Sequence, residues 1–369
     1  MSFAKLRALP FVLLLLPLDI LAACAVLVMD LALMPLRIFR RPPGEVASVD
    51  LSSVTIQILN WDGRHLMSEC LPAVVDAVKR QSLLSGHRHE ILVVDNGSTD
   101  GSVEYLRQQF PDVRVLPLDR NYGFSIGNNR GLQEVHSDVV VLLNNDMLVT
   151  ADFLEPLLTP FEDSSVFAVS SQIFFPDPGK RREETGKTMG KFENGFVRFW
   201  HEETTPEDEN RAMVPIFWAG GGASAVDVRK LKTLGGFDTL YHPFYVEDAD
   251  ISWQAWKRGW KCMLAPRSHV VHKHRGTSRP KFGDDFVDCT IRRNQFLFIW
   301  KNITDTGLIL QHLMGLPRIH GSAILLKGAR FEVRSYVAAI FRLPLALWRR
   351  GSNLSEYVAG DRDVLRSFQ

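Results

Sequence analysis

A carboxylate that ends an apolar run is the feature of this chain whose type and position most directly suggest chemistry. Residues 139–143 are Val or Leu throughout, and Asn144, Asn145 and Asp146 follow at once. If the run forms a buried strand, Asp146 lies at the carboxyl edge of a sheet, where open α/β sheets bind ligands. A carboxylate there can hold a divalent metal that neutralises a bound diphosphate. The alternative is a solvated turn, in which Asn and Asp are common.

Two further polar segments follow apolar runs. Residues 95–102 begin with Asp95, which could accept hydrogen bonds from a base or a ribose, and they include Ser98 and Asp100, which suit a helix N-terminus. The alternative for this segment is capping alone. Residues 121–131 are rich in Gly and Asn and lead into a predicted helix, an arrangement that brings backbone N–H groups to phosphates. Neither segment has dinucleotide-fingerprint or Walker spacing, which disfavours hydride and phosphoryl transfer.

Three carboxylates follow an aromatic run in the second half of the chain. Glu247, Asp248 and Asp250 come after Phe244 and Tyr245 and precede a stretch with helical apolar periodicity. The helix dipole stabilises acidic residues at a helix N-terminus, which accounts well for Asp250. It does not account for a carboxylate pair placed directly after aromatic residues. The helix N-terminus therefore leaves the positions of Glu247 and Asp248 unexplained.

Two loops near these carboxylates are candidates for binding. Residues 217–223 contain three consecutive glycines, which permit close approach of a ligand; the alternative is a plain turn at a strand edge. Residues 269–278 form a predicted loop with three histidines, His269, His272 and His274, after a strand predicted at 261–264. The alternative to binding is that this loop is only solvated. These histidines lack the spacing with cysteines that a zinc site requires.

The elements that must position these residues alternate along the chain. Short apolar runs predict strands, and the amphipathic stretches between them predict helices. The strands are expected at residues 54–59, 90–94, 113–118, 139–143 and 166–174, and the helices at 67–79, 103–110, 126–135 and 153–161. This alternation predicts an α/β fold with a mostly parallel sheet, flanked by helices, in βαβ units. The polar, charged residues 176–211 predict a mobile loop over the site.

The beginning of the chain differs from the rest. Residues 11–29 are almost all apolar, interrupted by Pro17 and Asp19, and three interpretations stay open: a transmembrane anchor, a kinked re-entrant or interfacial helix, and a cleaved signal peptide. The arginines within residues 37–41 favour a cytoplasmic location for the downstream domain. Residues 42–44 predict a short linker.

The last part of the chain also suggests a membrane. Residues 301–369 mix apolar blocks with Arg and Lys and are tipped by Trp348, which suits helices on a membrane surface. Helices that cap the preceding domain fit this pattern equally well. The full chain of 369 residues suits one large unit with appendages, and its net charge of +1 argues against nucleic-acid binding. Its four scattered cysteines indicate a reducing compartment.

Four motifs carry a family resemblance. Residues 59–63, 94–100, 121–124 and 144–146, in this order, resemble family 2 glycosyltransferases of the GT-A fold, most closely the bacterial rhamnosyltransferase-like branch. The resemblance covers about residues 54–300. It implies a nucleotide-sugar donor, a Mg²⁺ or Mn²⁺ ion, and transfer of a single sugar with inversion at the anomeric carbon.

The composition of the two ends and the resemblance of the part between them predict a division of the chain into three parts. Residues 1–44 would be a hydrophobic membrane anchor and linker, and residues 50–300 a GT-A catalytic domain. Within that domain, residues 50–150 would form the nucleotide-sugar half and residues 151–300 the acceptor half. Residues 301–369 would form a helical, membrane-associating region.

By the same resemblance, individual residues receive roles. Asp248 would be the catalytic base with Glu247 beside it, and Asp146 and His272 would hold the metal. Gly276 and Ser278 complete the pattern that His272 begins, and in this pattern the His completes the metal site or contacts the diphosphate. The residues expected to bind the donor are Asn60, Asp62, Asp95, Asn96, Ser98, Asn121, Gly123, Asn128 and Asn145. Those expected to bind the acceptor are Trp218, Gly221, Gly222 and Asp250.

The sequence departs from the family pattern at two positions. Asp62 stands where this branch usually carries Asn, which leaves its role in the donor pocket open. Asn144 replaces the first Asp of the common Asp-x-Asp form, which leaves one carboxylate for the metal.

These residues lead us to expect an enzyme anchored in the cell inner membrane with its catalytic domain facing the cytoplasm. Its acceptor would be a glycan hydroxyl on a lipid-linked oligosaccharide, and its donor sugar a hexose such as rhamnose. A processive polysaccharide synthase would need several spanning helices and a Gln-x-x-Arg-Trp signature, which residues 295–300 do not match. A non-catalytic scaffold that binds glycan is the alternative from another class, and the intact carboxylates speak against it.

Overall fold

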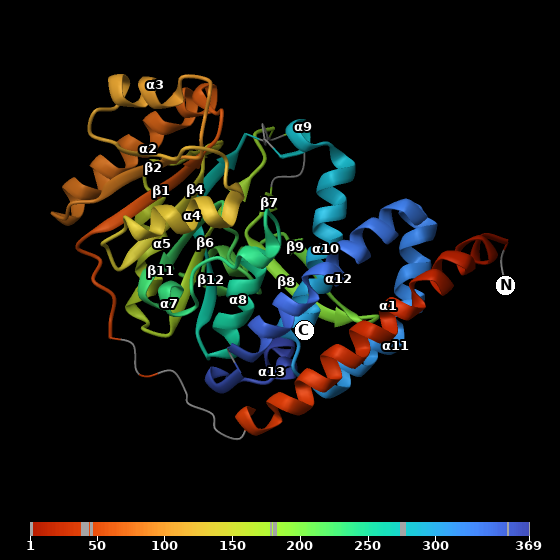
Figure 1. Cartoon of the computed structure of the whole chain (residues 1–369). Coiled ribbons are helices and arrows are strands. Elements are labelled where there is room, and N and C mark those ends of the chain that lie inside the picture. Colours follow the sequence, from red (N-terminus) through yellow and green to blue (C-terminus); the bar gives the residue numbers. More distant parts are fainter. Residues whose placement is uncertain are drawn as a thin grey trace.

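The structure, a computed structural model, describes residues 3–37, 44, 47–177, 179, 183–273, 278–352 and 354–368. A β-sheet with helices on both faces forms one part of the molecule, and a bundle of long helices packs beside it (Figure 1). The N-terminal helix α1 (Phe3–Leu33) lies on the outer side of this bundle. The predicted linker at residues 42–44 falls mostly outside the described residues.

The first half of the sheet is parallel, as predicted. Four strands lie side by side in the order β3-β2-β1-β4. Their bounds are β1 (Val54–Asn60), β2 (Glu90–Asp95), β3 (Arg114–Pro117) and β4 (Val139–Asn144), close to those expected from the apolar runs. The near-continuous Val, Leu and Ile sequences of β2 and β4 suit parallel strands that are buried on both faces, and β1 is buried too, with Thr55 and Gln57 between its apolar residues.

The second half of the sheet is mixed. β11 (Ala223–Asp227) runs antiparallel to β4 and to β6 (Val166–Phe174), and β12 (Lys261–His272) runs parallel to β6. Three short strands complete the sheet: β5 (Met147–Val149) and β10 (Val214–Pro215) pair with β12, and β7 (Glu183–Thr185) pairs with β6. The strand predicted at 261–264 is therefore the start of a much longer one.

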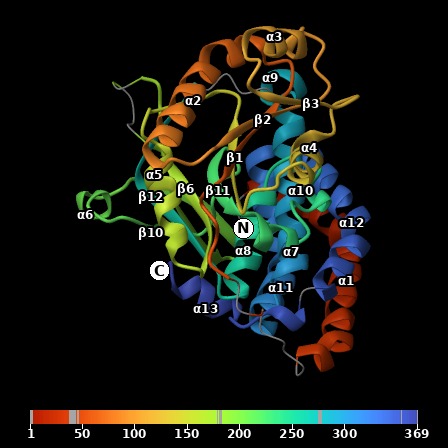
Figure 2. The same ribbon diagram turned by 90° about the vertical axis from the view of Figure 1, so that its left-hand side faces the viewer.

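Helices cover both faces of the sheet (Figures 1 and 2). Alternate strand residues point to opposite faces, so Val141 packs with α2 (Arg64–Ser85) and α5 (Leu154–Leu158) on one side. Leu142 packs on the other side with α4 (Gly123–Gln133), α7 (Val228–Thr233) and α8 (Glu247–Lys257). The remaining short elements are α3 (Ser102–Gln109), η2 (Thr159–Glu162), α6 (Pro206–Glu209), η3 (Thr239–Tyr241) and α9 (Ser278–Phe282).

The prediction of a loop at residues 176–211 is wrong over most of this range. It contains a β-hairpin, β8 (Lys187–Glu193) and β9 (Phe196–Glu202), although residues 178 and 180–182 lie outside the described part. Phe196 and Phe199 of the hairpin pack edge-on against aromatic rings of α10 (Asp284–Asn302), at centroid distances of 5.1 and 5.4 Å. The sequence pattern missed the hairpin because its apolar residues find their partners on a helix far along the chain.

Long helices form the bundle beside the sheet. α11 (Thr306–Lys327) and α12 (Ala329–Ser352) follow α10, and the chain continues with η4 (Leu354–Glu356) and α13 (Asp361–Arg366). α12 packs on α10, and α1 packs on both α11 and α12, followed by η1 (Met34–Arg37). The C-terminal helices thus pack as a cap beside the sheet, which is one of the two interpretations of this region.

One helix among the described residues has the length and apolar composition to cross a membrane. It comprises residues Ala8–Leu33 of α1. Alone this is a weak indication, because buried core helices and signal sequences have the same composition.

Candidate active site at the sheet edge

The polar segments singled out in the sequence meet at one edge of the sheet. In the strand register, Asn60 at the end of β1 lies opposite Asp95 at the end of β2, and Leu59 lies opposite Asn144 at the end of β4. Parallel strands end on the same side, so the loops that follow these strands are neighbours. This is the sheet edge at which open α/β folds bind their ligands.

A buried set of polar side chains connects these loops. Asn60 donates to Oδ2 of Asp95 at 3.0 Å and accepts from Asn145 at 2.8 Å. Asp95 also accepts the backbone N–H of Ser98 at 2.9 Å. Asn60 and Asp95 are almost fully buried, whereas Ser98 and Asn145 keep part of their surface exposed. The buried pair therefore positions the exposed pair.

The Gly/Asn-rich segment is held in the same way. Asn96, which is buried, donates to Asn121 at 3.0 Å and to the Gly123 carbonyl at 3.2 Å. Asn121 in turn accepts the backbone N–H of Gly123 at 2.7 Å. Asn128 lies deeper, where its Oδ1 accepts from Nε2 of Gln57 on β1 at 2.9 Å, so this contact fixes α4 on the sheet. Eight of the nine predicted donor residues thus lie around this edge, with Asn128 behind them.

Asp62 has a partner that the sequence did not indicate. Lys281 of α9 donates to Oδ2 of Asp62 at 2.6 Å, and its ammonium lies 3.6 Å from the centroid of the Trp61 ring. Thr99 donates its backbone N–H to Oδ1 of Asp62 at 2.7 Å. Burial alone would raise the pKa of Asp62, but these hydrogen bonds hold that pKa below its ordinary value. Trp61 stands inside the first motif, which is the signal that could have identified this cluster.

The two predicted metal ligands are in contact. Nε2 of His272 lies 3.1 Å from Oδ2 of Asp146. Asp146 is nearly buried, and the His272 side chain is 19% exposed, so the pair opens toward the site from one side. The predicted partner Gly276 lies outside the described residues, as does the side chain of Ser278. No cluster of three or more His, Cys, Asp or Glu side chains that could hold a metal ion occurs in the described part of the chain.

The glycine loop connects Asp146 to the acidic pair. The Asn144 backbone N–H donates to the Gly222 carbonyl at 2.8 Å, and the Gly221 N–H points at Oδ2 of Asp248 at 3.4 Å. A Cβ at Gly222 would lie 2.8 Å from the Asn144 side chain, so this close approach requires glycine. Asp248 is partly exposed, and burial of its carboxylate raises its pKa above the ordinary value.

Glu247 lies next to Asp248 in a drier environment. It is 5% exposed, and its Oε2 atom has no hydrogen-bond partner among the described residues. Burial, followed by the charge of the neighbouring Asp248, raises the pKa of Glu247 well above its ordinary value. The pair therefore contains one carboxyl that favours its protonated form and one that faces the site. Such divergent environments are typical of acid–base sites.

The structure does not bring Trp218 and Asp250 to the surface of the site. Asp250 is fully buried, and its oxygens accept from Tyr241, Lys301 and Asn302 at 2.7, 2.6 and 2.7 Å. Trp218 is 8% exposed and packs its ring against Phe199 of the hairpin. Asp250 therefore fixes α8 to the end of α10, and Trp218 belongs to the core.

A second group missed by the sequence reasoning holds the segment before Glu247. Tyr245 and Val246 have φ angles of +71° and +78°, a left-handed conformation that is costly for a β-branched residue. The buried Asn294 of α10 lies within 2.8–3.1 Å of the backbone carbonyls of Tyr241, Phe244 and Tyr245. The carbonyl of Pro243 accepts the N–H of Phe124, which joins this segment to the donor side.

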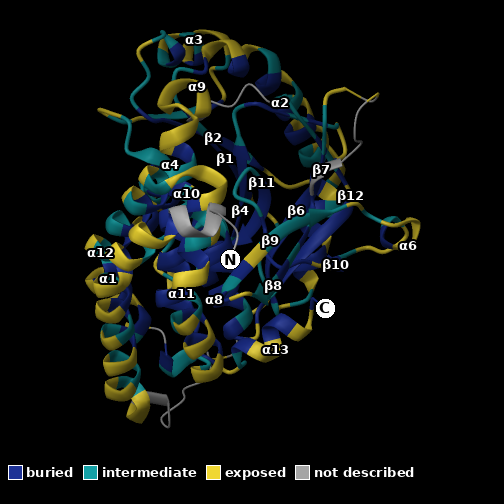
Figure 3. Ribbon diagram, turned by 90° about the vertical axis from the view of Figure 1, so that its right-hand side faces the viewer, coloured by how far each residue is buried: buried dark blue, intermediate teal, exposed yellow. Residues whose placement is uncertain are grey.

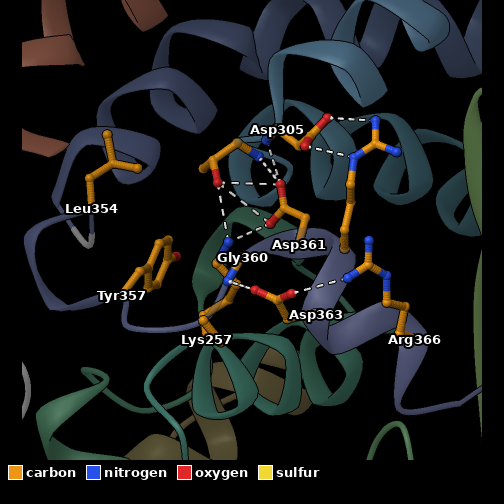
Figure 4. A pocket seen from close by; sticks show the side chains of 11 residues that line it. Lys257, Asp305, Leu354, Tyr357, Gly360, Asp361, Asp363 and Arg366 are labelled. Atoms are coloured by element: carbon orange, nitrogen blue, oxygen red, sulfur yellow. Dashed lines mark hydrogen bonds and ion pairs between the residues drawn. The ribbon is translucent and has the colours of Figure 1, made fainter.

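A polar pocket of about 340 Å³ lies elsewhere, between the end of α10 and α13 (Figure 4). Its charged side chains already pair with one another: Lys257 with Asp361, and Arg362 with Asp305. Asp361 also accepts the backbone N–H groups of Thr304 and Asp305. This pocket fixes the C-terminal segment and contains none of the motif residues.

Comparisons with known proteins agree with this geometry. Residues 65–232 match the family model described as Glycosyl transferase family 2. The N-acetylglucosaminyl-diphospho-decaprenol L-rhamnosyltransferase of Mycobacterium tuberculosis is 26% identical over 219 residues, which cover 52% of this chain and 68% of that protein. Polypeptide N-acetylgalactosaminyltransferase 5 of Mus musculus is 25% identical over 226 residues, 56% of this chain but 23% of the relative.

A solved structure shows the same fold. The crystal structure of GalNAc-T7 with UDP, GalNAc and Mn²⁺ superposes with a TM-score of 0.53 at 19% identity, over 68% of this chain and 48% of that one. The central region of this chain is thus a GT-A-like sheet flanked by helices. The motif order, the sheet edge and the family match together show a glycosyltransferase whose residues 65–232 form a family 2 domain on a GT-A-like fold, and this region is similar to a bacterial rhamnosyltransferase.

Proposed function

We propose that this glycosyltransferase is metal-dependent and inverting, and that it moves one sugar from a nucleotide-sugar donor to a glycan hydroxyl in cell-surface polysaccharide biosynthesis. The observation that carries the proposal is the backbone connection between Asn144 and Gly222, beside the contact of Gly221 with Asp248. It brings the predicted base to the sheet edge at which the donor-binding loops end. Inverting transfer needs these two groups on one side of the fold.

Asp248 acts as the base in this proposal. Its carboxylate removes the proton of the acceptor hydroxyl while that oxygen attacks the anomeric carbon and the bond to the nucleoside diphosphate breaks. The raised pKa of Asp248 brings its basicity closer to neutral pH, which favours proton transfer. Glu247 stays protonated behind it and keeps a second negative charge out of the pocket.

The donor lies on the exposed polar groups at the ends of β1, β2 and β4. Ser98, Asn121 and Asn145 present hydrogen-bonding groups there, and buried Asn60, Asp95 and Asn96 keep them in place. The Trp61 ring beneath the Lys281 ammonium adds an aromatic surface and a positive charge, which suits a base and a diphosphate.

Asp146 and His272 would hold a Mg²⁺ or Mn²⁺ ion. Their facing oxygen and nitrogen atoms fit such an ion, and two protein ligands are enough when phosphates and water supply the others. The solved relative that carries Mn²⁺ supports this assignment. When bound, the ion supplies positive charge to the departing diphosphate.

A lipid-linked oligosaccharide, for example on a polyprenyl diphosphate, is the proposed acceptor. The name of the mycobacterial relative includes a diphospho-decaprenol substrate, which supports this choice. The apolar helix α1 supports a location at the inner membrane, and the arginines within residues 37–41 support a catalytic domain facing the cytoplasm.

A donor panel tests the proposal. The purified full chain would be assayed for sugar transfer and donor hydrolysis with dTDP-, UDP- and GDP-sugars, after chelation and again with Mn²⁺ added. Metal-dependent turnover of one donor is expected, abolished by Asp248→Asn and retained by Asp112→Asn, an exposed control carboxylate. If no donor turns over and no nucleotide binds with Mn²⁺ present, the chain is a glycan-binding scaffold instead.

A further inference from the structure

Large apolar side chains are exposed along α1 and the neighbouring α11. Examples are Leu14, Leu21, Val28 and Leu31 on α1, and Met314 and Leu326 on α11. Exposed residues line both helices along the outer side of the bundle (Figure 3). So many exposed large apolar side chains on two neighbouring helices indicate an interaction site, since soluble surfaces rarely gather them.

Two buried polar contacts dock α1 onto the bundle. Asp19 of α1 lies 3.0 Å from Nε2 of His320 on α11, and Nδ1 of His320 lies 2.7 Å from Glu332 on α12. Glu332 is also paired with Arg292 of α10. Asp19, His320 and Glu332 are all buried. The chain of contacts therefore runs from α1 to α10, which carries the aromatic core of the bundle.

The second contact lies nearer the end of α1. Arg350 of α12 makes a bidentate ion pair with Asp30, at 2.6 and 2.8 Å, and donates to the Trp300 carbonyl at 3.0 Å. Arg350 is 1% exposed. Removing either partner of such a buried pair leaves an uncompensated charge, which is strongly unfavourable. Both acidic residues of Ala8–Leu33 are therefore fixed to the bundle.

This docking is incompatible with a helix that spans a bilayer alone. If α1 left the bundle to span the bilayer, Asp19 would enter the hydrocarbon without a partner, which is unfavourable for a carboxylate. Glu332 and Arg350 would lose partners at the same time. If α11 and α12 entered with α1, they would carry α10 and the catalytic domain packed on it into the membrane.

Basic side chains on α11 and on the following helix α12 suit the anionic headgroups of a membrane. Residues 306–352 contain seven Arg and Lys residues and one acidic residue, the buried Glu332. Arg318, Arg330 and Arg334 are exposed. Arg318 lies four residues after Met314, on the exposed stripe of α11, where it can reach headgroups only if that stripe inserts shallowly.

We propose that α1 and α11 form a monotopic membrane-binding surface, in which α1 lies within one leaflet of a bilayer that contains anionic lipids. The surface places the catalytic domain against the membrane without a spanning segment. This inference rests on the proposed function, whose lipid-linked acceptor lies in a membrane.

Cysteine accessibility tests the topology. In a Cys24→Ser, Cys289→Ser background, Lys5→Cys and Met34→Cys, which lie just outside the apolar residues 8–33, would mark the two ends of α1 in a bacterial host. An impermeant maleimide is expected to label neither site in intact spheroplasts and both after lysis. Labelling of one end before lysis would show a spanning helix and overturn the proposal. The double substitution Asp19→Leu, Asp30→Leu removes both contacts that dock α1 on the bundle. In this variant one end of α1 is expected to be labelled before lysis and the other only after it, as in a spanning helix.

Vesicle flotation tests the partner. The full chain is expected to float with phosphatidylcholine vesicles that contain phosphatidylglycerol, and flotation is expected to fall in high salt and in Arg318→Glu, Arg330→Glu. The control Arg88→Glu, at an exposed position just after α2, is expected to float normally. If the chain stays with the soluble fraction and forms a dimer instead, a second copy covers this surface and the proposal is overturned. Donor turnover is measured separately, so loss of activity with intact flotation overturns the proposed function alone.

Discussion

Nε2 of His272 lies 3.1 Å from Oδ2 of Asp146, although 126 residues separate them in the chain. The short strand β5 accounts for this contact, because its first residue Met147 pairs with His272 at the end of β12. Asp146 directly precedes that pairing, so the register of one antiparallel bridge brings carboxylate and imidazole together. The proposed metal site thus depends on a strand of three residues.

Metal dependence is expected to respond to both side chains. Asp146→Ala should abolish transfer, and His272→Ala should raise the Mn²⁺ concentration needed for half-maximal activity by roughly tenfold or more. Titration of activity with Mn²⁺ after chelation measures this shift. His136→Ala, an exposed histidine outside the site, is the control. An unchanged Mn²⁺ titration in His272→Ala would remove this residue from the site.

Replacement of the proposed base should affect turnover more than donor binding. Asp248→Asn is expected to lower kcat by roughly 10²–10⁴-fold, because the acceptor hydroxyl loses its proton acceptor. The raised pKa of Asp248 also predicts that kcat/KM falls on the acid side at a pH above that of an ordinary Asp carboxyl. Rate profiles against pH measure this limb. If kcat/KM stays constant down to the pH at which an ordinary Asp carboxyl titrates, Asp248 is not the base.

The burial of Glu247 should appear in the pH dependence of stability. A carboxyl whose pKa is raised on folding stabilises the protein at low pH, and this contribution is lost as the pH rises through the folded-state pKa. Glu247→Gln mimics the protonated form, so its Tm should match wild type in acid and exceed it at neutral pH. Thermal melts at several pH values check this. If the Tm of Glu247→Gln matches that of wild type in acid but falls below it at neutral pH, Glu247 is not protonated in the folded protein.

Lys281 should matter for the donor rather than for folding. Its ion pair with Asp62 is partly exposed, and such pairs contribute about 0.2–1 kcal/mol to stability. Lys281→Met is therefore expected to unfold almost as wild type does, while its donor KM rises because a cation beside the proposed diphosphate is lost. Kinetics with varied donor, together with chemical denaturation, separate the two effects. Lys79→Met, on the outer part of α2, serves as the control.

Asn294 should support the geometry of the base. Its side chain lies near three buried backbone carbonyls, so Asn294→Ala is expected to cost at least about 1–3 kcal/mol of stability and to lower kcat. The strained backbone at Tyr245 and Val246 relaxes without it, and Asp248 moves with that segment. Denaturant melts and kcat under conditions where the variant stays folded test this. Reduced stability with wild-type kcat would show that Asn294 is only structural.

Much of the fold was readable from local patterns. The runs at residues 90–94 and 139–143 correspond to β2 and β4 because parallel strands buried on both faces are rich in Val, Ile and Leu, and the run at 54–59 corresponds to β1 although Thr55 and Gln57 interrupt it. The polar residues that end those runs meet at one edge because parallel strands share a direction. The hairpin β8–β9 was missed because its aromatic residues pack against α10, which no local pattern could indicate.

The site divides in the same way. Residue types and motif order determined the carboxylates, the glycine loop and the family, because these residues act through chemistry that few other side chains supply. Tertiary structure alone decided which of these residues stay exposed at the sheet edge. Asp250 is buried and accepts hydrogen bonds from Lys301 and Asn302, and Asp62 is paired with Lys281. Tertiary structure also decided that Asp19 in the apolar helix docks on His320. A side chain's partners depend on contacts between residues distant in the chain, and such contacts exist only once the elements have packed.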